Sequence, residues 1–286
     1  MFKEAIIKQY IGCLALIITA SSIQSCKDNN KDTAIDLYNQ AETYYNAGEY
    51  NKSIVLLDSL KKNFTDDIDL LRNGLHLRML ANEGLIKAEI LHNDSIISEL
   101  ETENKMYSSK FKYITHKDMV EGFYVHNSIV GDIERTEKNT IEPRIDENDM
   151  FYLVSYLTGH DIKHTSIIVS TNGNSVASSI VPYDKAQNYR YSSDGKTYEI
   201  VTFNNNQCDT IGEFIANNDS YPIKVTFQGK KTYSLQLDKK EIKAIAETYR
   251  YATNKNKGKS AIKNRMFLEK KLNLAEKQIE QTKINK

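Results

Sequence analysis

The spacing of apolar residues between Ile86 and Ile114 constrains the fold of this chain more than any other feature. Intervals of four and three residues alternate there, and seven of the nine positions are apolar: Ile86, Ile90, Asn93, Ile97, Leu100, Asn104, Tyr107, Phe111 and Ile114. Most residues between them are charged or polar, such as Glu99, Glu101 and Lys105. This spacing predicts a long amphipathic helix that buries one stripe against a partner helix.

A second stretch repeats this spacing near the C-terminus, at Leu268, Leu272, Ala275, Ile279 and Thr282. We therefore predict a long antiparallel coiled-coil hairpin that pairs residues 86–116 with residues 259–284, and the intervening chain is inserted at its tip. The same heptads are compatible with pairing between two chains, in which Asn93 and Asn104 would set the register. Self-assembly between chains is therefore an alternative reading of this feature.

The N-terminus has the order of a secretory signal, because Lys3 and Lys8 precede a short apolar run over residues 10–20. That run is too short to span a bilayer, which needs about 20 apolar residues. Residues 23–26 then read Ile-Gln-Ser-Cys. They resemble a bacterial lipobox, with an aliphatic residue three positions before the cysteine and a small one directly before it. Gln24 departs from the small residue usual at its position.

This resemblance implies removal of residues 1–25 and acylation of Cys26 with palmitate-type chains, which would hold the protein on a membrane. An ordinary cleaved signal with a chance cysteine is the alternative. Residues 26–33 are polar and partly acidic, a composition that predicts a flexible tether. They resemble the start of mature lipoproteins from Bacteroidetes-type bacteria. The implied location is the outer membrane, with the periplasmic face and the cell surface both left open.

Charge and cysteine content exclude several classes of function. The 38 basic and 38 acidic residues cancel, so the chain offers no basic field for nucleic acid. The lipobox resemblance implies that Cys13 leaves with the signal and that Cys26 carries lipid. Cys208 is then alone, so no internal disulfide forms in the mature chain, and we expect Cys208 to be a small, partly buried residue near a helix start.

Residues 34–85 are predicted to form a helical module. Residues 34–64 resemble one tetratricopeptide repeat, because the repeat's large, small, aromatic and glycine positions are occupied by Leu37, Ala41, Tyr44, Gly48, Tyr50, Leu57 and Leu60. Ser53 stands where the repeat usually has alanine. Ala41 and Ser53 are expected to let two helices approach, and Gly48 to form the turn. The resemblance implies a groove near Tyr44, Tyr45 and Tyr50 that takes a peptide or a partner helix.

Apolar residues alternate with a period of two over residues 120–238, which predicts an inserted antiparallel β domain. Eight strands are expected, at residues 122–130, 150–158, 164–171, 175–182, 188–192, 196–203, 223–228 and 231–237. Asn172-Gly173 and Asp194-Gly195 mark tight hairpin turns, and Asp209 is expected to cap a short helix that ends at Asn217. The pattern does not distinguish a sandwich from a partly open barrel.

Asp238 is expected to cap a further helix, with a break at residues 254–258 before the final helix. These segments make up the C-terminal helices over residues 239–286. The overall prediction is an α+β chain with helical arms around a β domain.

The sequence contains two groups of residues with some resemblance to metal sites, and neither fits one. His160 and His164 have the spacing of a helical zinc pair, but Gly159 and the β-rich residues that follow predict a turn in which the two imidazoles diverge. Asp146 and Asp149 lie in an acidic loop that lacks the glycine and distal glutamate of a calcium hand. We therefore assign no catalytic residue, metal or cofactor.

Tyrosines recur through the β domain, at Tyr152, Tyr156, Tyr183, Tyr189, Tyr191 and Tyr198. They fit either strand propensity and core packing or an exposed contact surface. The sequence thus predicts a lipid-anchored envelope protein that acts as an interaction or scaffold module and is not an enzyme. The alternative is a small glycan- or ligand-binding protein, or an enzyme, that uses the β domain.

Overall fold

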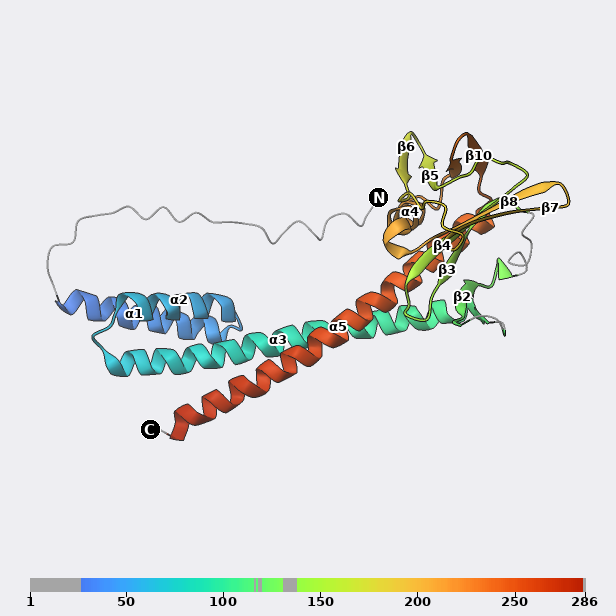
Figure 1. The fold of residues 1–286 in the computed structure, drawn as a ribbon. Helices are drawn as coiled ribbons and strands as arrows, with labels where there is room; N and C mark the ends of the chain where they lie inside the picture. Colours follow the sequence, from blue (N-terminus) through green and yellow to red (C-terminus); the bar gives the residue numbers. More distant parts are fainter. Residues whose placement is uncertain (1–26, 116, 118–119, 131–137, 285–286) are drawn as a thin grey trace. The chain divides into compact units, whose positions relative to one another are not determined.

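The computed structural model describes residues 27–115, 117, 120–130 and 138–284 (Figure 1). Within these ranges it contains five helices and two antiparallel sheets, so the predicted α+β class is confirmed. The chain divides into two compact units. Among the described residues, the helical unit consists of residues 27–85 together with residues 275–284, and the sheet unit lies within Ile86–Leu274. The predicted signal peptide and Cys26 lie outside the described residues.

The helical unit begins with α1 (Lys27–Asn46) and α2 (Tyr50–Asn63), which pack side by side (Figure 1). Gly48 has a φ of 75° in the turn between them, a conformation that glycine adopts without steric cost. Ala41 and Ser53 are both fully buried, so the small residues at these positions let the two helices approach closely. Both roles were predicted from the sequence.

We predicted a flexible tether over residues 26–33, and this prediction is wrong for residues 27–33, because α1 begins at Lys27. No glycine or proline occurs between Lys27 and Asn46, so nothing in the local chain opposes continuation of the helix. The polar and charged residues in this segment are therefore part of α1.

The third helix, α3 (Ile68–Ser108), is 41 residues long and contributes to both units. Asp67 caps it, since its side-chain Oδ1 accepts a hydrogen bond from the backbone N–H of Leu70 at 3.0 Å. The predicted helix over residues 86–116 ends early, because β1 (Phe111–Ile114) follows Ser108. Phe111 and Ile114 fit the heptad by spacing, but they belong to a strand.

The last helix, α5 (Lys239–Ile284), runs for 46 residues without the predicted break at residues 254–258. Polar side chains from that segment are engaged within the sheet unit. Asn254 Nδ2 donates to Glu103 Oε2 at 2.5 Å, and Asn256 Nδ2 donates to the carbonyl of Asp149 at 2.8 Å. These contacts stabilise α5 across residues 254–258, although the local sequence there favours a break in the helix. The predicted cap is confirmed, since Asp238 and Glu241 bond each other's backbone N–H groups at 2.8 Å.

Within the sheet unit, α3 and α5 contact each other in antiparallel order. Asn264 Nδ2 donates to Asn93 Oδ1 at 3.1 Å, and Glu103 accepts from Asn254. The ring of Tyr107 stacks on that of Tyr251 with centroids 5.8 Å apart. Residue numbers therefore fall along α5 as they rise along α3.

Ten strands form the two sheets of this unit. The larger sheet, sheet A, has the order β1-β2-β3-β4-β8-β7, and sheet B has the order β10-β9-β5-β6. Every pairing between neighbouring strands is antiparallel. The bounds after β1 are β2 (Phe123–His126), β3 (Thr140–Ile145), β4 (Phe151–Thr158), β5 (Ser166–Thr171), β6 (Asn174–Ala177), β7 (Asn188–Ser193), β8 (Lys196–Phe203), β9 (Lys224–Gln228) and β10 (Thr232–Gln236).

Two separate sheets share one core, which makes the β domain sandwich-like. Sheet A contributes Leu153 and Phe203, sheet B contributes Val169 and Phe227, and Ile245 of α5 joins them. The positive φ angles of the two predicted hairpin turns are present, at Asn172-Gly173 and Asp194-Gly195.

The short helix α4 (Asn205–Asn217) covers part of this core and begins earlier than predicted. Its cap is Asn204 and not Asp209, because Asn204 and Gln207 form a capping box. The Gln207 side chain accepts the backbone N–H of Asn204 at 2.8 Å. Asp209 is instead a helix residue one turn further on.

Candidate functional site

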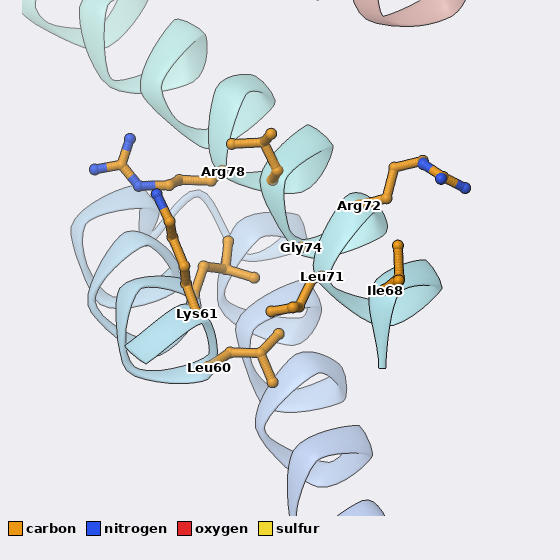
Figure 2. A pocket seen from close by; sticks show the side chains of 9 residues that line it. Leu60, Lys61, Ile68, Leu71, Arg72, Gly74 and Arg78 are labelled. Carbon is orange, nitrogen blue, oxygen red and sulfur yellow. The ribbon is translucent and has the colours of Figure 1, made fainter. Parts of the chain in front are cut away.

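An apolar groove lies between α2 and the first three turns of α3 in the helical unit (Figure 2). We call it the α2–α3 groove; its volume is about 320 Å³ and its lining is Leu57, Leu60, Lys61, Ile68, Leu71, Arg72, Gly74, Leu75 and Arg78. Leu57 and Leu60 are buried at its floor, whereas Ile68 is 69% and Leu75 45% exposed at its margin. The groove therefore combines a buried leucine floor with apolar side chains at its margin that are open to contact.

The two helices approach closely at the groove because α3 has a glycine there. A Cβ atom on Gly74 would lie 3.0 Å from Leu60 Cδ2 and 3.7 Å from Leu57 Cδ2. The missing side chain lets the backbone of α3 pack closely against these two leucines, which are 1–2% exposed. A glycine inside a helix costs about 1 kcal/mol relative to alanine, and here it creates room between two helices.

Positive side chains border the groove, and no acidic residue lines it. Figure 2 shows Lys61 and Arg78 extending to one side of the leucines and Arg72 to the other. Arg78 binds Asp58 through two hydrogen bonds of 2.6 and 3.2 Å, which lower the pKa of the aspartate. Arg72 pairs with Asp69 at 2.9 Å. The guanidinium groups are thereby held in place and keep further N–H donors.

The predicted partner-binding tyrosines lie elsewhere in the helical unit, around the turn between α1 and α2. Tyr45 packs against Tyr50 with ring centroids 5.9 Å apart, and the ammonium of Lys52 lies 5.2 Å from the ring of Tyr44. A Cβ atom on Gly84 would come within 2.5 Å of the Tyr50 ring, so this ring packs on the backbone of α3. All three tyrosines are half-buried, and none lines the α2–α3 groove.

Five of the six tyrosines noted in the β domain share one face of sheet A. The pairing of β4, β8 and β7 places Tyr152, Tyr156, Tyr198, Tyr189 and Tyr191 on that face. The cross-strand pair Tyr191 and Tyr198 stacks with centroids 4.7 Å apart and an interplanar angle of 4°. Burial raises the pKa of Tyr156 to about 12, and its hydroxyl accepts a 2.9 Å hydrogen bond from Arg144. Most of this face is therefore packed within the sheet unit.

On the opposite face of sheet A, Ser155 of β4 and Glu199 of β8 are joined through hydrogen bonds to His164, which lies in the segment before β5. Ser155 Oγ lies 2.7 Å from His164 Nε2, and His164 Nδ1 lies 2.7 Å from Glu199 Oε2. If the serine donates to Nε2, then Nδ1–H donates to the carboxylate and the imidazole is neutral. This order of bonds is the same as in a serine hydrolase triad.

This network differs from a working triad because all three of its side chains are buried. Ser155 and His164 are 0% exposed and Glu199 is 1% exposed, so a substrate has no path to the hydroxyl. Glu199 also accepts the backbone N–H groups of Lys163 and His164 at 2.6 Å each. The carboxylate thus fastens the segment before β5 to sheet A, which is a structural function.

His164 was a candidate from the sequence, but its partners Ser155 and Glu199 were not. A signal for these partners was present in the sequence. Ser155 and Glu199 are polar residues at core-facing positions of β4 and β8, where the neighbouring residues on the same face are apolar. His160 has different neighbours and stacks on Tyr233, with ring centroids 3.9 Å apart. The two histidines therefore diverge, in agreement with the predicted turn.

Other groups considered from the sequence are engaged by the protein. In the acidic loop, Asp146 accepts the backbone N–H of Met150 at 2.7 Å, and Asp149 pairs with Lys255 and, at 2.7 Å, with Lys259. Cys208 is fully buried, donates its thiol to the carbonyl of Phe203 and has a pKa raised by burial. Among the described residues no cluster of three or more histidine, cysteine, aspartate or glutamate side chains is arranged to hold a metal.

No described helix is both long enough and apolar enough to cross a membrane. Comparison with known proteins gave no match to any family model, curated protein or solved structure.

Proposed function

We propose that this protein is a lipid-anchored scaffold of the bacterial cell envelope and that the α2–α3 groove is its partner-binding site. The observation that carries the proposal is the exposed apolar margin of the groove, at Ile68 and Leu75, above a buried leucine floor. Exposed apolar area of this kind gains free energy when a partner removes it from water, at about 25 cal/mol per Å². Attachment to the outer membrane through Cys26 remains a proposal based on the lipobox resemblance.

The helical unit is proposed to be tetratricopeptide-like. The fully buried Ala41 and Ser53, the positive φ of Gly48 and the packing of Tyr50 on α3 support this. Repeats of this type bury their faces by stacking on neighbouring helical pairs. A module with one repeat therefore depends on another helix for cover, which is consistent with an interaction role.

The paired stretches of α3 and α5 are proposed to form a coiled coil that supports the sheet unit. Asn93 is 7% exposed on α3 and bonds Asn264 of α5. A buried asparagine at the seam of a coiled coil, here Asn93 with an exposed partner at Asn264, fixes register at a cost in stability. The sheet unit then acts as a rigid body held by two long helices, with the Ser155–His164–Glu199 network inside its core.

The anchor is tested by growing cells with an alkyne-labelled fatty acid and comparing the parent with Cys26→Ser. We expect label on the parent, no label on Cys26→Ser, and release of that variant from the membrane fraction. Equal labelling of both proteins would overturn the lipoprotein assignment. This test does not depend on the groove.

The scaffold role is tested by affinity purification of the full-length protein from detergent-solubilised envelope, followed by mass spectrometry. We expect a partner at near-equal stoichiometry with the parent and its loss with Leu75→Asp. The matched control is Val55→Asp, because Val55 is an exposed α2 residue outside the groove lining. Recovery of the protein alone, or equal loss of the partner with both variants, would contradict the scaffold role.

A further inference from the structure

We infer that the occupant of the α2–α3 groove is an amphipathic helix with acidic residues along both edges of its apolar stripe. This inference rests on the proposed function and specifies the chemistry of the partner. It is carried by the helical spacing of the groove lining and by the sign of the charges beside it.

The lining residues of α3 lie on one helical stripe. Ile68, Leu71, Leu75 and Arg78 are separated by three, four and three residues, the spacing that places side chains on one face of a helix. Together with Leu57 and Leu60 of α2 they leave a trough between two helices. Ridges of side chains on a third helix pack into such grooves at interaxial distances of about 8–10 Å.

The length of the stripe sets the length of the occupant. Residues 68–78 rise about 15 Å at 1.5 Å per residue, which corresponds to about three helical turns. The partner segment therefore needs apolar residues at two or three successive turns. An extended strand does not fit as well, because its side chains alternate between faces at a period of two.

The direction of α3 explains why the position is open. In stacked helical repeats, each helical pair is covered by the helices of the next repeat. After its first turns α3 does not reverse; it continues to Ser108 as one helix. A helix antiparallel to α3, in the place that a following repeat would fill, is the element that the groove accommodates.

The charge of the groove margin selects an acidic partner. Lys61, Arg72 and Arg78 are the charged residues among the nine that line the groove. Arg72 and Arg78 already pair with Asp69 and Asp58, and their guanidinium groups keep N–H donors for a further carboxylate. The three cationic side chains flank the leucines on both sides (Figure 2). Glutamates or aspartates on both edges of a docked helix complement these cations, and lysines or arginines there meet like charge.

The test uses two synthetic helical peptides of 14 residues and the full-length lipidated protein in nanodiscs of zwitterionic lipid. Both peptides carry leucines at i, i+3, i+7 and i+10; one has glutamates on both edges of this stripe and its twin has lysines at the same places. Binding is measured by fluorescence anisotropy of the labelled peptides. We expect the acidic peptide to bind at least about tenfold more tightly than the basic twin.

Groove variants separate apolar docking from charge selection. Leu75→Asp is expected to reduce binding of the acidic peptide at least about tenfold, and Val55→Asp to leave it unchanged. Because Leu75 is 45% exposed and Val55 66% exposed, neither change removes a buried side chain. Joint replacement Lys61→Glu and Arg72→Glu is expected to reverse the preference, so that the basic peptide binds more tightly.

Three results would overturn the inference: no binding of the acidic peptide up to about 1 mM, equal affinity of the two peptides for the parent, or binding that Leu75→Asp does not weaken. If the peptides fail but Leu75→Asp still loses the envelope partner, the partner chemistry is wrong and the scaffold role stands. If both fail, the groove is not a docking site. A partner mapped as a second copy of this chain would also overturn the inference.

Discussion

Glu199→Gln should destabilise the sheet unit by about 2–4 kcal/mol, although it replaces one oxygen by a nitrogen of similar size. The carboxylate accepts three hydrogen bonds, from the backbone N–H groups of Lys163 and His164 and from His164 Nδ1. Glutamine offers one acceptor oxygen. In its best orientation this oxygen keeps both bonds to His164, and its amide nitrogen then faces the N–H of Lys163.

Two losses add up in that orientation. The buried N–H of Lys163 loses its partner, which costs about 1–3 kcal/mol. The two remaining bonds lose their charge assistance, because hydrogen bonds to ionised groups are roughly twice as strong as neutral ones. Solvent does not compensate, since Glu199 is 1% exposed.

Hydrogen exchange measured by mass spectrometry on the full-length protein gives a local readout. At about 1.4 kcal/mol per tenfold, the expected loss accelerates exchange about 30- to 1,000-fold in peptides that cover residues 163–171 and 196–203. The matched control is Glu213→Gln on α4, where the same chemical change occurs at an exposed side chain and is expected to cost less than about 0.5 kcal/mol. Equal exchange in Glu199→Gln and the parent would refute the reasoning.

We also expect Glu199→Gln to change how the free energy of unfolding depends on pH. Burial raises the pKa of Glu199, but the hydrogen bonds from His164 and from the backbone of Lys163 and His164 outweigh burial, and the net pKa is lowered. The stabilisation is therefore present above the unfolded pKa of about 4.3 and is lost as pH falls toward the lower folded value. Acid titration of stability should show this loss in the parent and a smaller loss in Glu199→Gln.

Three further substitutions or reactions test other features. Ser53→Ala should stabilise the helical unit by about 1 kcal/mol and so raise its melting temperature, because the buried hydroxyl has no hydrogen-bond partner among the described residues and alanine favours helix. A lower melting temperature would contradict the tetratricopeptide-like packing. Gly229→Ala should accelerate hydrogen exchange in residues 159–171, because its Cβ would lie 2.3 Å from the carbonyl oxygen of Ile162, and unchanged exchange would show that the contact is not tight. Native Cys208 should not react with a thiol reagent at pH 8 until the protein unfolds, since it is buried and its pKa is raised; rapid native labelling would show that the site opens.

Elements with regular local patterns were predictable from the sequence. The strand at Lys196–Phe203 has the predicted bounds, because alternating apolar residues and the preceding Asp194-Gly195 turn both indicate it. The cap at Asp238 was also predicted correctly. Each of these features depends on residues within a few positions of one another, so the chain itself carries the information.

Two strands were missed because their residues also suit another structure. Phe111 and Ile114 of β1 continue the heptad spacing of α3, and only strand pairing with β2 settles their conformation. Within β3, Pro143 argues against a strand because proline cannot donate to the ladder. The strand forms nevertheless: β3 pairs with β4 at Pro143, and its pairing with β2 is confined to Ile145.

The candidate sites show the same division between local and distant information. The tyrosines near Gly48 were chosen from a local motif, and the structure places them in packing contacts. The α2–α3 groove depends on the angle at which two helices meet and on the absence of a side chain at Gly74. No sequence pattern encodes that geometry directly. The same is true of Ser155, His164 and Glu199, which lie on three separate segments.

The discontinuous helical unit has a consequence for biosynthesis. Residues 27–85 belong to one compact unit with residues from Ala275 onward, and His76 Nδ1 lies 3.2 Å from Thr282 Oγ1 across that junction. During synthesis these two parts emerge separated by the whole sheet unit. The first helices therefore wait for the end of α5 before their unit is complete, and a newly made chain passes through a stage with apolar helical surface uncovered. Chaperones that bind apolar surface would meet the protein at that stage, before any mature partner does.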